Sequence, residues 1–336
     1  MTELEQHLLN DYQRDFPLVP APFAQIAADL GVAENEVFEM LARLRQEGSV
    51  SRVGAVFRPH TIGASTLAAI AVPADKLADV AQQVSAFPEV NHNYEREHRY
   101  NLWFVVTAPG SEQLNEALRR IEQETGYPLL VLPMIEDFHI DLGFDLKRKV
   151  SGVPGRVRGG HRRQGESEPA VVYQPHSAEA ELIAAIQNGI PLVSRPYAEL
   201  GALAGMTEAE AISCLTQLLA QGIIRRLGVV VRHHELGYRA NAMVVWDVPD
   251  TDVGEVGRCL GQFDCVTLCY RRPRRLPEWR YNLFSMIHGR DRDEVLGLIE
   301  QLRVTCNLEN IAYEVLFSRR RFKQCGARYA VATAAV

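Results

Sequence analysis

One short segment brings together arginines, aromatic residues and a histidine: YEREHRYNLWF, residues 94–104. Arginine guanidiniums hold carboxylates through paired hydrogen bonds, and aromatic faces stack on planar rings. A histidine can deliver a proton near neutral pH or ligate a metal. The segment therefore suits a large, flat, anionic ligand. Its candidate catalytic residue is His98, and its candidate binding residues are Tyr94, Arg96, Arg99 and Trp103.

The segment occurs a second time, in altered form, as YRRPRRLPEWRYNLF at residues 270–284. Both copies begin with tyrosine and end in Arg-Tyr-Asn-Leu-aromatic, but Trp279 stands where the first copy has His98. A histidine that only supported the fold would be expected in both copies. We therefore predict that the first copy is catalytic and that the second binds anions without supplying an acid or base.

Each of these residues also has a purely structural interpretation. Charged residues of a hairpin can form solvated ion pairs of little energetic value. Tyr100 and Trp103, taken singly, are typical of a protein core, and a single histidine is most often a surface residue. Two hairpins that both retain Arg-Tyr-Asn-Leu nevertheless need a shared reason, which favours a functional role for His98 and Arg99.

The duplication extends over the whole chain. FPLVPAPFAQIAADLG at residues 16–31 matches IPLVSRPYAELGALAG at residues 190–205. At the same offset, Gly48, Arg52, Gly54 and Gly63 match Gly222, Arg226, Gly228 and Gly237. The chain therefore consists of two related halves, and a Gly-, Pro- and Arg-rich stretch between them reads as a flexible linker.

Each half predicts the same order of elements. In the first half, helical patterns at 22–30 and 34–46 form a helix-turn-helix, and short strands on either side of Gly54 add a wing. Next come a strand at 66–72, a helix at 75–87, strands at 90–95 and 100–107, a helix at 111–124 and a strand at 129–134. This βαββαβ order is the ferredoxin-like arrangement.

The predicted fold class is therefore α+β, a tandem repeat of a winged helix-turn-helix and a ferredoxin-like domain. The predicted segments are 1–62 (winged helix-turn-helix), 63–146 (ferredoxin-like), 147–177 (linker), 178–236 (winged helix-turn-helix) and 237–329 (ferredoxin-like). Because such domains usually pair sheet to sheet, we expect the two halves to form an internal pseudo-dimer, and further oligomerisation is compatible with it.

Composition and charge restrict the functional classes. The net charge of −6 and the glutamates that open both second helices, AENEVFEM and TEAEAISC, disfavour DNA binding. No apolar run is long enough to cross a membrane, and the N-terminus lacks a signal-peptide pattern, so we expect a cytoplasmic protein. The six cysteines form no CxxC pair, which favours reduced, mostly buried thiols.

A winged helix followed by a ferredoxin-like domain resembles the Lrp/AsnC family, whose best-known members are transcription regulators. The segment YEREHRYNLW at 94–103 and the stretch LPMIEDFHIDLGFDL at 132–146 resemble a narrower branch, the sirohaem (siroheme) decarboxylases. The two-copy chain resembles the fused decarboxylase of d1-type haem biosynthesis. A non-catalytic tetrapyrrole carrier and a DNA-binding regulator remain the alternatives.

The resemblance implies that sirohaem loses the carboxyl groups of two acetate side chains and becomes 12,18-didecarboxysirohaem. It implies no required cofactor, since the iron belongs to the substrate, and it allows other proteins of the same pathway as partners. His98 would supply a proton, stabilise the reacting acetate or serve as an axial ligand to the iron. The complete set of candidate substrate-binding residues is Tyr94, Arg96, Arg99, Trp103, His139, Arg271 and Arg280. His139 also reads as an ordinary strand-end histidine.

Overall fold

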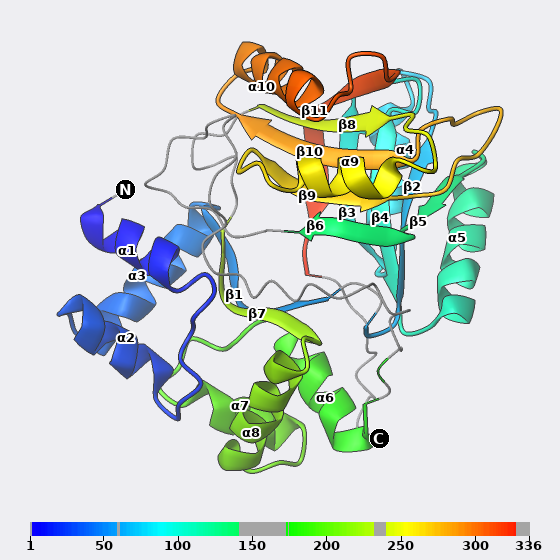
Figure 1. The fold of residues 1–336 in the computed structure, drawn as a ribbon. Coiled ribbons are helices and arrows are strands. Elements are labelled where there is room, and N and C mark those ends of the chain that lie inside the picture. Colours follow the sequence, from blue (N-terminus) through cyan, green and yellow to red (C-terminus); the bar gives the residue numbers. More distant parts are fainter. Residues whose placement is uncertain (1, 59–60, 141–172, 174, 232–239, 327–336) are drawn as a thin grey trace.

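The computed structural model contains a helical unit and a unit built on one large β-sheet, which lie side by side (Figure 1). It describes residues 2–58, 61–140, 173, 175–231 and 240–326. Nearly all of the predicted linker, 147–177, lies outside these residues, and the predicted domain boundaries therefore stay predictions. The two units do not correspond to the two halves of the sequence, because each half contributes to both.

The helical unit contains the helix-turn-helix modules of both halves (Figure 1). Its helices are α1 (Glu3–Asp11), α2 (Pro22–Leu30), α3 (Glu34–Gln46), α6 (Ser177–Ile186), α7 (Pro196–Leu203) and α8 (Glu208–Ala220). The predicted helix-turn-helix is confirmed. Gly31 ends α2 with φ 69°, and its repeat partner Gly205 follows α7 with φ 66°, so both glycines serve helix termination. Apolar side chains of both modules share one core.

The strand after each helix-turn-helix is continuous and pairs with its counterpart from the other half. β1 (Val50–Phe57) and β7 (Ile224–Val231) form a two-stranded antiparallel sheet in which Gly54 lies opposite Gly228. The predicted wing, a hairpin turning at Gly54, is therefore wrong. A Cβ atom on Gly228 would lie 2.4 Å from the backbone oxygen of Tyr12. Close backbone packing, and not a turn, requires this glycine.

The sheet unit contains both ferredoxin-like domains, and the predicted βαββαβ order is confirmed in each. The first has β2 (Ala64–Ile70), α4 (Leu77–Ala86), β3 (Val90–Arg96), β4 (Leu102–Ala108), α5 (Ser111–Thr125) and β5 (Leu130–Pro133). The second has β8 (Ala240–Trp246), α9 (Val253–Leu260), β9 (Val266–Arg271), β10 (Leu283–Gly289), α10 (Arg292–Thr305) and β11 (Tyr313–Gln324).

The last strand of each half crosses to the other half. β11 pairs with β8 through residues 313–317 and with β3 through residues 318–324. β6 (Glu136–Ile140) follows β5 and pairs with β9 of the second half. The result is one nine-stranded sheet in the order β5-β2-β4-β3-β11-β8-β10-β9-β6. The halves therefore form the predicted internal pseudo-dimer, joined by strand exchange.

One face of each ferredoxin-like domain is covered by its own helices, α4 and α5 in the first half and α9 and α10 in the second (Figure 1). The opposite faces contribute to one shared cluster, which we call the inter-half core. It includes Trp103 and Leu132 of the first half and Trp279, Phe284 and Leu316 of the second. The inter-half core lies directly beside the two repeated hairpins.

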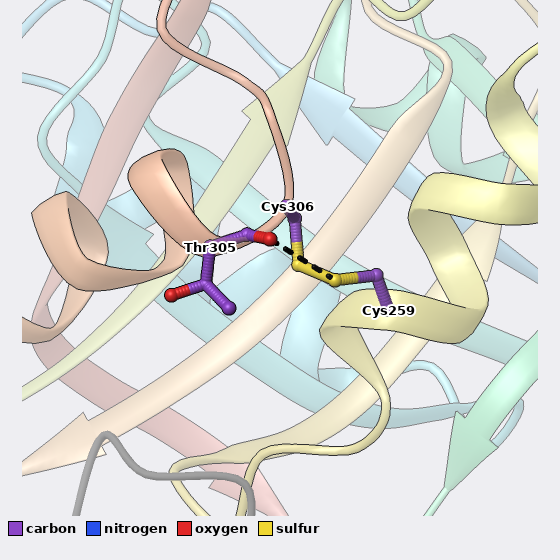
Figure 2. Close-up of a disulfide and its surroundings, with 3 residues drawn as sticks. All are labelled: Cys259, Thr305 and Cys306. Atoms are coloured by element: carbon purple, nitrogen blue, oxygen red, sulfur yellow. Dashed lines mark hydrogen bonds between the residues drawn. A yellow bond between two sulfur atoms is a disulfide. The ribbon is translucent and has the colours of Figure 1, made fainter.

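A disulfide joins Cys259, in α9, to Cys306, which follows α10 (Figure 2). The expectation of reduced cysteines is therefore wrong for this pair. It holds for Cys214, Cys265 and Cys269, which are free and buried. The bridge was missed because the two cysteines lie 47 residues apart in the sequence and meet only when both helices cover the same face.

In the described part of the chain, no helix is long and apolar enough to span a membrane.

Candidate active site

The hairpin between β3 and β4 is fastened to the end of β2 by its asparagine. The Asn101 side chain accepts from the backbone N–H of Val72 at 2.9 Å and donates to the Val72 carbonyl at 2.8 Å. In the second half, Asn282 makes the same two bonds with Val248, at 3.0 and 2.8 Å. The repeated asparagine therefore has a structural cause, because it anchors both hairpins in the same way.

One buried arginine in each hairpin fastens one half to the other. Arg96 Nη1 donates to the carbonyl of Leu316 at 3.0 Å, and Arg272 Nη1 donates to the carbonyl of Leu132. Both arginines are 7% exposed, and burial lowers the pKa of Arg96 to about 10. The structure thus places the candidate residue Arg96 inside the protein, where it holds the exchanged strand.

His98 lies at the tip of the first hairpin with both ring nitrogens engaged. Its Nδ1 accepts from the backbone N–H of Tyr100 at 2.9 Å, and its Nε2 lies 2.8 Å from Oε2 of Glu314. Because Nδ1 is an acceptor, the proton of the neutral ring is on Nε2 and is donated to Glu314. Burial lowers the pKa of His98, while the Glu314 carboxylate acts in the opposite direction.

Glu314 belongs to β11 and brings the second half into the site. Its other oxygen, Oε1, accepts from the hydroxyl of Tyr281 at 2.7 Å. Burial and the Glu314 carboxylate raise the pKa of Tyr281. The side chain of His98 is 11% exposed and that of Glu314 is 44% exposed, so solvent reaches the carboxylate more readily than the imidazole. Sequence reasoning missed Glu314. The one signal for it was the position of an acidic residue within an otherwise apolar strand.

Trp279, which takes the place of His98 in the second copy, forms a wall of the His98 site. The two rings meet edge to face with centroids 5.5 Å apart, and Trp279 also contacts Trp103 at 5.3 Å and Tyr281 at 5.1 Å. Trp103 is buried and donates its Nε1–H to the Tyr100 carbonyl. Trp103 is therefore part of the core and not an open stacking platform.

The counterpart of Glu314 in the first half is apolar. Glu314 pairs with Val245 of β8, and Leu130 pairs with Ala69, the residue of β2 that corresponds to Val245. Leu130 therefore occupies the position in the first half that Glu314 occupies in the second. The second hairpin therefore has no equivalent of the His–Glu pair. Trp279 replaces the histidine, Leu130 replaces the glutamate, and both belong to the inter-half core.

The remaining candidate arginines lie near the hairpins but differ in what they contact. Arg99 is exposed, lies over the Tyr100 ring at 5.0 Å and donates to a backbone carbonyl of the second hairpin. Arg280 pairs with Asp247 at 2.6 Å, and Arg271 pairs with Asp250 at 2.9 Å. Arg280 is exposed, so an anionic ligand can compete with Asp247 for it. Arg271 is half-buried and lies opposite Leu283, whose side chain is in the core under α9 and α10, so it is on the helix-covered face.

Two further candidates lie on opposite faces of the sheet. Tyr94 faces Trp103 across β3 and β4, on the side of the inter-half core. His139 pairs with Cys269, whose side chain is in the core under α9 and α10. Its Cβ lies 2.8 Å from where a Cβ on Gly261 would be. This face is opposite to the one that carries the inter-half core, which favours the strand-end interpretation of His139.

Known proteins share both the sequence and the fold. A family model described as "AsnC-like ligand binding domain" matches residues 61–139 and 235–323. Another, described as "Siroheme decarboxylase NirDL-like HTH domain", matches residues 5–50 and 179–225. The siroheme decarboxylase NirDL subunit of Paracoccus denitrificans (strain Pd 1222) is 43% identical over 331 residues, covering 98% of this chain and 98% of that protein.

Two solved structures resemble the whole chain. The crystal structure of the siroheme decarboxylase NirDL matches with a TM-score of 0.68 and 30% identity, covering 97% of this chain and 94% of that one. The same protein in co-complex with an iron-uroporphyrin III analogue matches with a TM-score of 0.67 and 29% identity, covering 97% and 93%. The chain therefore belongs to the sirohaem decarboxylase family, in the two-copy NirDL form.

Proposed function

We propose that this chain converts sirohaem to 12,18-didecarboxysirohaem for d1-type haem biosynthesis, by removing two acetate carboxyl groups without an oxidant. Family membership supports a carboxy-lyase acting on sirohaem, and the co-complex of the NirDL relative supports a tetrapyrrole site. The observation in this chain that carries the proposal is the His98–Glu314 pair, enclosed by aromatic rings and bordered by arginines.

The chemistry needs a proton at each reacting side chain. The bond between the carboxyl carbon and the methylene carbon breaks, carbon dioxide leaves, and the electron pair stays with the methylene carbon and its pyrrole ring. One proton then completes the new methyl group. His98 is suited to supply that proton. Axial ligation of the iron by His98 is the competing assignment. Both roles would use Nδ1, and both require its hydrogen bond from the backbone N–H of Tyr100 to open.

Substrate carboxylates that do not react would be held by the exposed arginines. Arg99 lies next to His98 in sequence, and Arg280 lies next to Trp279 in the second hairpin. Arg96 would act indirectly, since it fixes β3 to β11. The aromatic wall of Trp279 would disfavour the charge on a reacting acetate and so assist loss of carbon dioxide.

We infer that one site per chain performs both decarboxylations, so that the macrocycle turns or rebinds between them. This inference is supported by Trp279 and Leu130, which replace the His–Glu pair in the second copy. A cytoplasmic location, contact with other proteins of the pathway and further oligomerisation stay predictions. DNA binding is not expected, and Glu34, at the start of α3, is held by the Ser194 hydroxyl at 3.0 Å.

Anaerobic incubation with sirohaem, followed by mass spectrometry of the extracted tetrapyrrole, tests the proposed function. Loss of two carbon dioxide units is the expected result. An unchanged mass with a shifted absorption spectrum would identify a carrier and contradict the proposal. An unchanged mass and spectrum, together with salt-sensitive binding to a specific DNA sequence, would identify a regulator.

A further inference from the structure

We propose that Glu314 and Tyr281 position His98 for proton transfer through Nδ1, so that the second half of the chain completes the active site of the first. This proposal rests on the proposed decarboxylase function. No sequence motif pointed to Glu314, and Tyr281 was part of the repeated Arg-Tyr-Asn-Leu without an assigned role. Both are positioning residues, because they act on the substrate through His98.

The hydrogen bonds at His98 separate the roles of its two nitrogens. Nε2–H is directed at the Glu314 carboxylate, 2.8 Å away, and this bond fixes the ring orientation and the tautomer. A carboxylate that holds one imidazole nitrogen leaves the other nitrogen for chemistry. Here that nitrogen is Nδ1, which accepts from the backbone N–H of Tyr100 until it takes up a proton.

Tyr281 fixes Glu314 in turn. An isolated carboxylate that is 44% exposed would sample several rotamers, but its Oε1 accepts from the Tyr281 hydroxyl at 2.7 Å. Tyr281 is itself 9% exposed and packs edge to face on Trp279. The buried aromatic cluster therefore fixes Tyr281, Tyr281 fixes the Glu314 carboxylate, and Glu314 fixes the His98 ring.

The pair also supports the protonated state of the ring. Burial disfavours a charged His98 imidazole, and the Glu314 carboxylate beside Nε2 acts in the opposite direction. In each turnover the proton on Nδ1 goes to the methylene carbon as carbon dioxide leaves, and the ring becomes neutral. A new proton from water then returns to Nδ1. It does not pass through Glu314, because Nε2, the nitrogen that faces Glu314, already carries a proton. One proton is consumed for each carbon dioxide released, so the step balances without an oxidant or reductant.

The internal repeat gives independent support. Tyr100 is the repeat partner of Tyr281, and it has no carboxylate to hold because Leu130 stands where Glu314 stands. The Glu and the His are thus present together in one site and absent together in the other. A glutamate that merely made the surface polar would have no reason to vary with the histidine.

The test compares Glu314→Gln and Tyr281→Phe with Glu255→Gln, a matched control on the exposed side of α9. Three measurements are made on each full-length variant. They are the ¹⁵N chemical shifts of the His98 ring over a pH titration, sirohaem affinity from absorption, and single-turnover decarboxylation by mass spectrometry. The His98 signals are identified by their loss in a His98→Ala variant.

Glu314→Gln keeps a hydrogen-bond acceptor but removes the charge that supports protonation of His98. The pKa of His98 should therefore fall, and the pH above which turnover declines should move lower. The charged and titratable groups around the pair are Glu314, Arg99, Tyr100 and Tyr281. Turnover should fall about 10–100-fold with sirohaem affinity unchanged, and Tyr281→Phe should have a smaller effect in the same direction.

Two results would overturn the proposal. One is a Glu314→Gln protein with an unchanged His98 titration and wild-type turnover. The other is a variant that binds sirohaem more tightly and turns over faster, which would mean that Glu314 occupies the place of a substrate carboxylate. Failure of the wild-type chain to decarboxylate sirohaem would refute the proposed function instead, and the ¹⁵N titration would still report whether Glu314 controls His98.

Discussion

The two repeated hairpins are anchored by the same hydrogen bonds but carry different residues at their tips. Each is anchored by an asparagine to the preceding strand and by a buried arginine to the other half. At the tip, the first hairpin places His98 against Glu314, and the second places Trp279 in the same core as Leu130. The asparagine and the buried arginine that both copies retain therefore hold the fold, and the replacement of His98 and Glu314 by Trp279 and Leu130 indicates where the function lies.

The duplication also explains why the site spans the whole chain. In a symmetric dimer, each hairpin would meet an identical strand from its partner. Here the exchanged strand of one half carries Glu314 and that of the other carries Leu130, so the two junctions differ. One junction is polar and open to solvent at its carboxylate, and the other is part of the inter-half core.

The largest effect on stability is expected at the tip of the second hairpin. Trp279→Ala should lower the free energy of unfolding by about 3–5 kcal/mol, because it leaves a cavity in the inter-half core. His98→Ala, at the matching position, should cost about 1 kcal/mol, because it removes the ring's hydrogen bonds at the edge of the inter-half core and leaves a smaller cavity. Urea denaturation followed by circular dichroism measures both. Equal destabilisation by the two variants would contradict the contrast between the hairpins, and Leu276→Ala, at an exposed site, is the control.

The disulfide makes a further difference between the halves. All six cysteines lie in the second half, so the first half has no such bridge. Replacing Cys259 and Cys306 by serine should lower the free energy of unfolding by about 2–4 kcal/mol. Non-reducing peptide mapping checks the bridge, and urea midpoints with and without reductant check its effect. A midpoint that does not respond to reductant would show that the bridge contributes nothing in solution.

The two buried arginines should behave alike. Arg96→Met and Arg272→Met each leave a buried carbonyl without its donor, so each should cost about 1–3 kcal/mol. Thermal and urea denaturation measure the stability, and absorption titration measures sirohaem affinity. Similar losses of stability would confirm that both arginines fasten the halves together. A selective loss of sirohaem affinity in the Arg96 variant would instead support direct substrate contact.

A milder contrast concerns pH. His92 of β3 and His288 of β10 have pKa values lowered by burial to about 4, from the ordinary value of 6.5, with Arg52 and Arg96 adding repulsion. The unfolded chain therefore binds more protons between these values. Stability should be full above pH 6.5 and should fall as the pH approaches 4.

Urea midpoints at a series of pH values measure this loss. His92→Gln and His288→Gln should each flatten the profile. A profile that both core variants leave as steep as wild type would show that other groups cause the acid sensitivity.

Local pattern was enough to predict the helices and strands within each half. The helices at 22–30 and 34–46 agree with the structure because their apolar period and flanking residues act locally. The pairing of β1 with β7 was not predictable, since strand alternation is the same whichever strand lies alongside. Gly54 was misread as a turn for the same reason.

The candidate site was predicted only in part. His98 was found because it breaks the repeat, but Glu314 arrives from the far end of the chain through strand exchange, which the sequence does not encode locally. Arg96 was interpreted as a ligand-binding residue because an arginine in a charged hairpin reads as exposed. Its burial depends on a carbonyl contributed by the other half.

The inference that a single site works in each chain can be tested with His98→Ala. The purified variant is incubated anaerobically with sirohaem, and the extracted tetrapyrrole is analysed by mass spectrometry. We expect bound but unconverted sirohaem, with turnover reduced by roughly 10²–10⁴-fold. A product that has lost one carboxyl group at the wild-type rate would contradict this inference, because it would show that the second hairpin acts on its own.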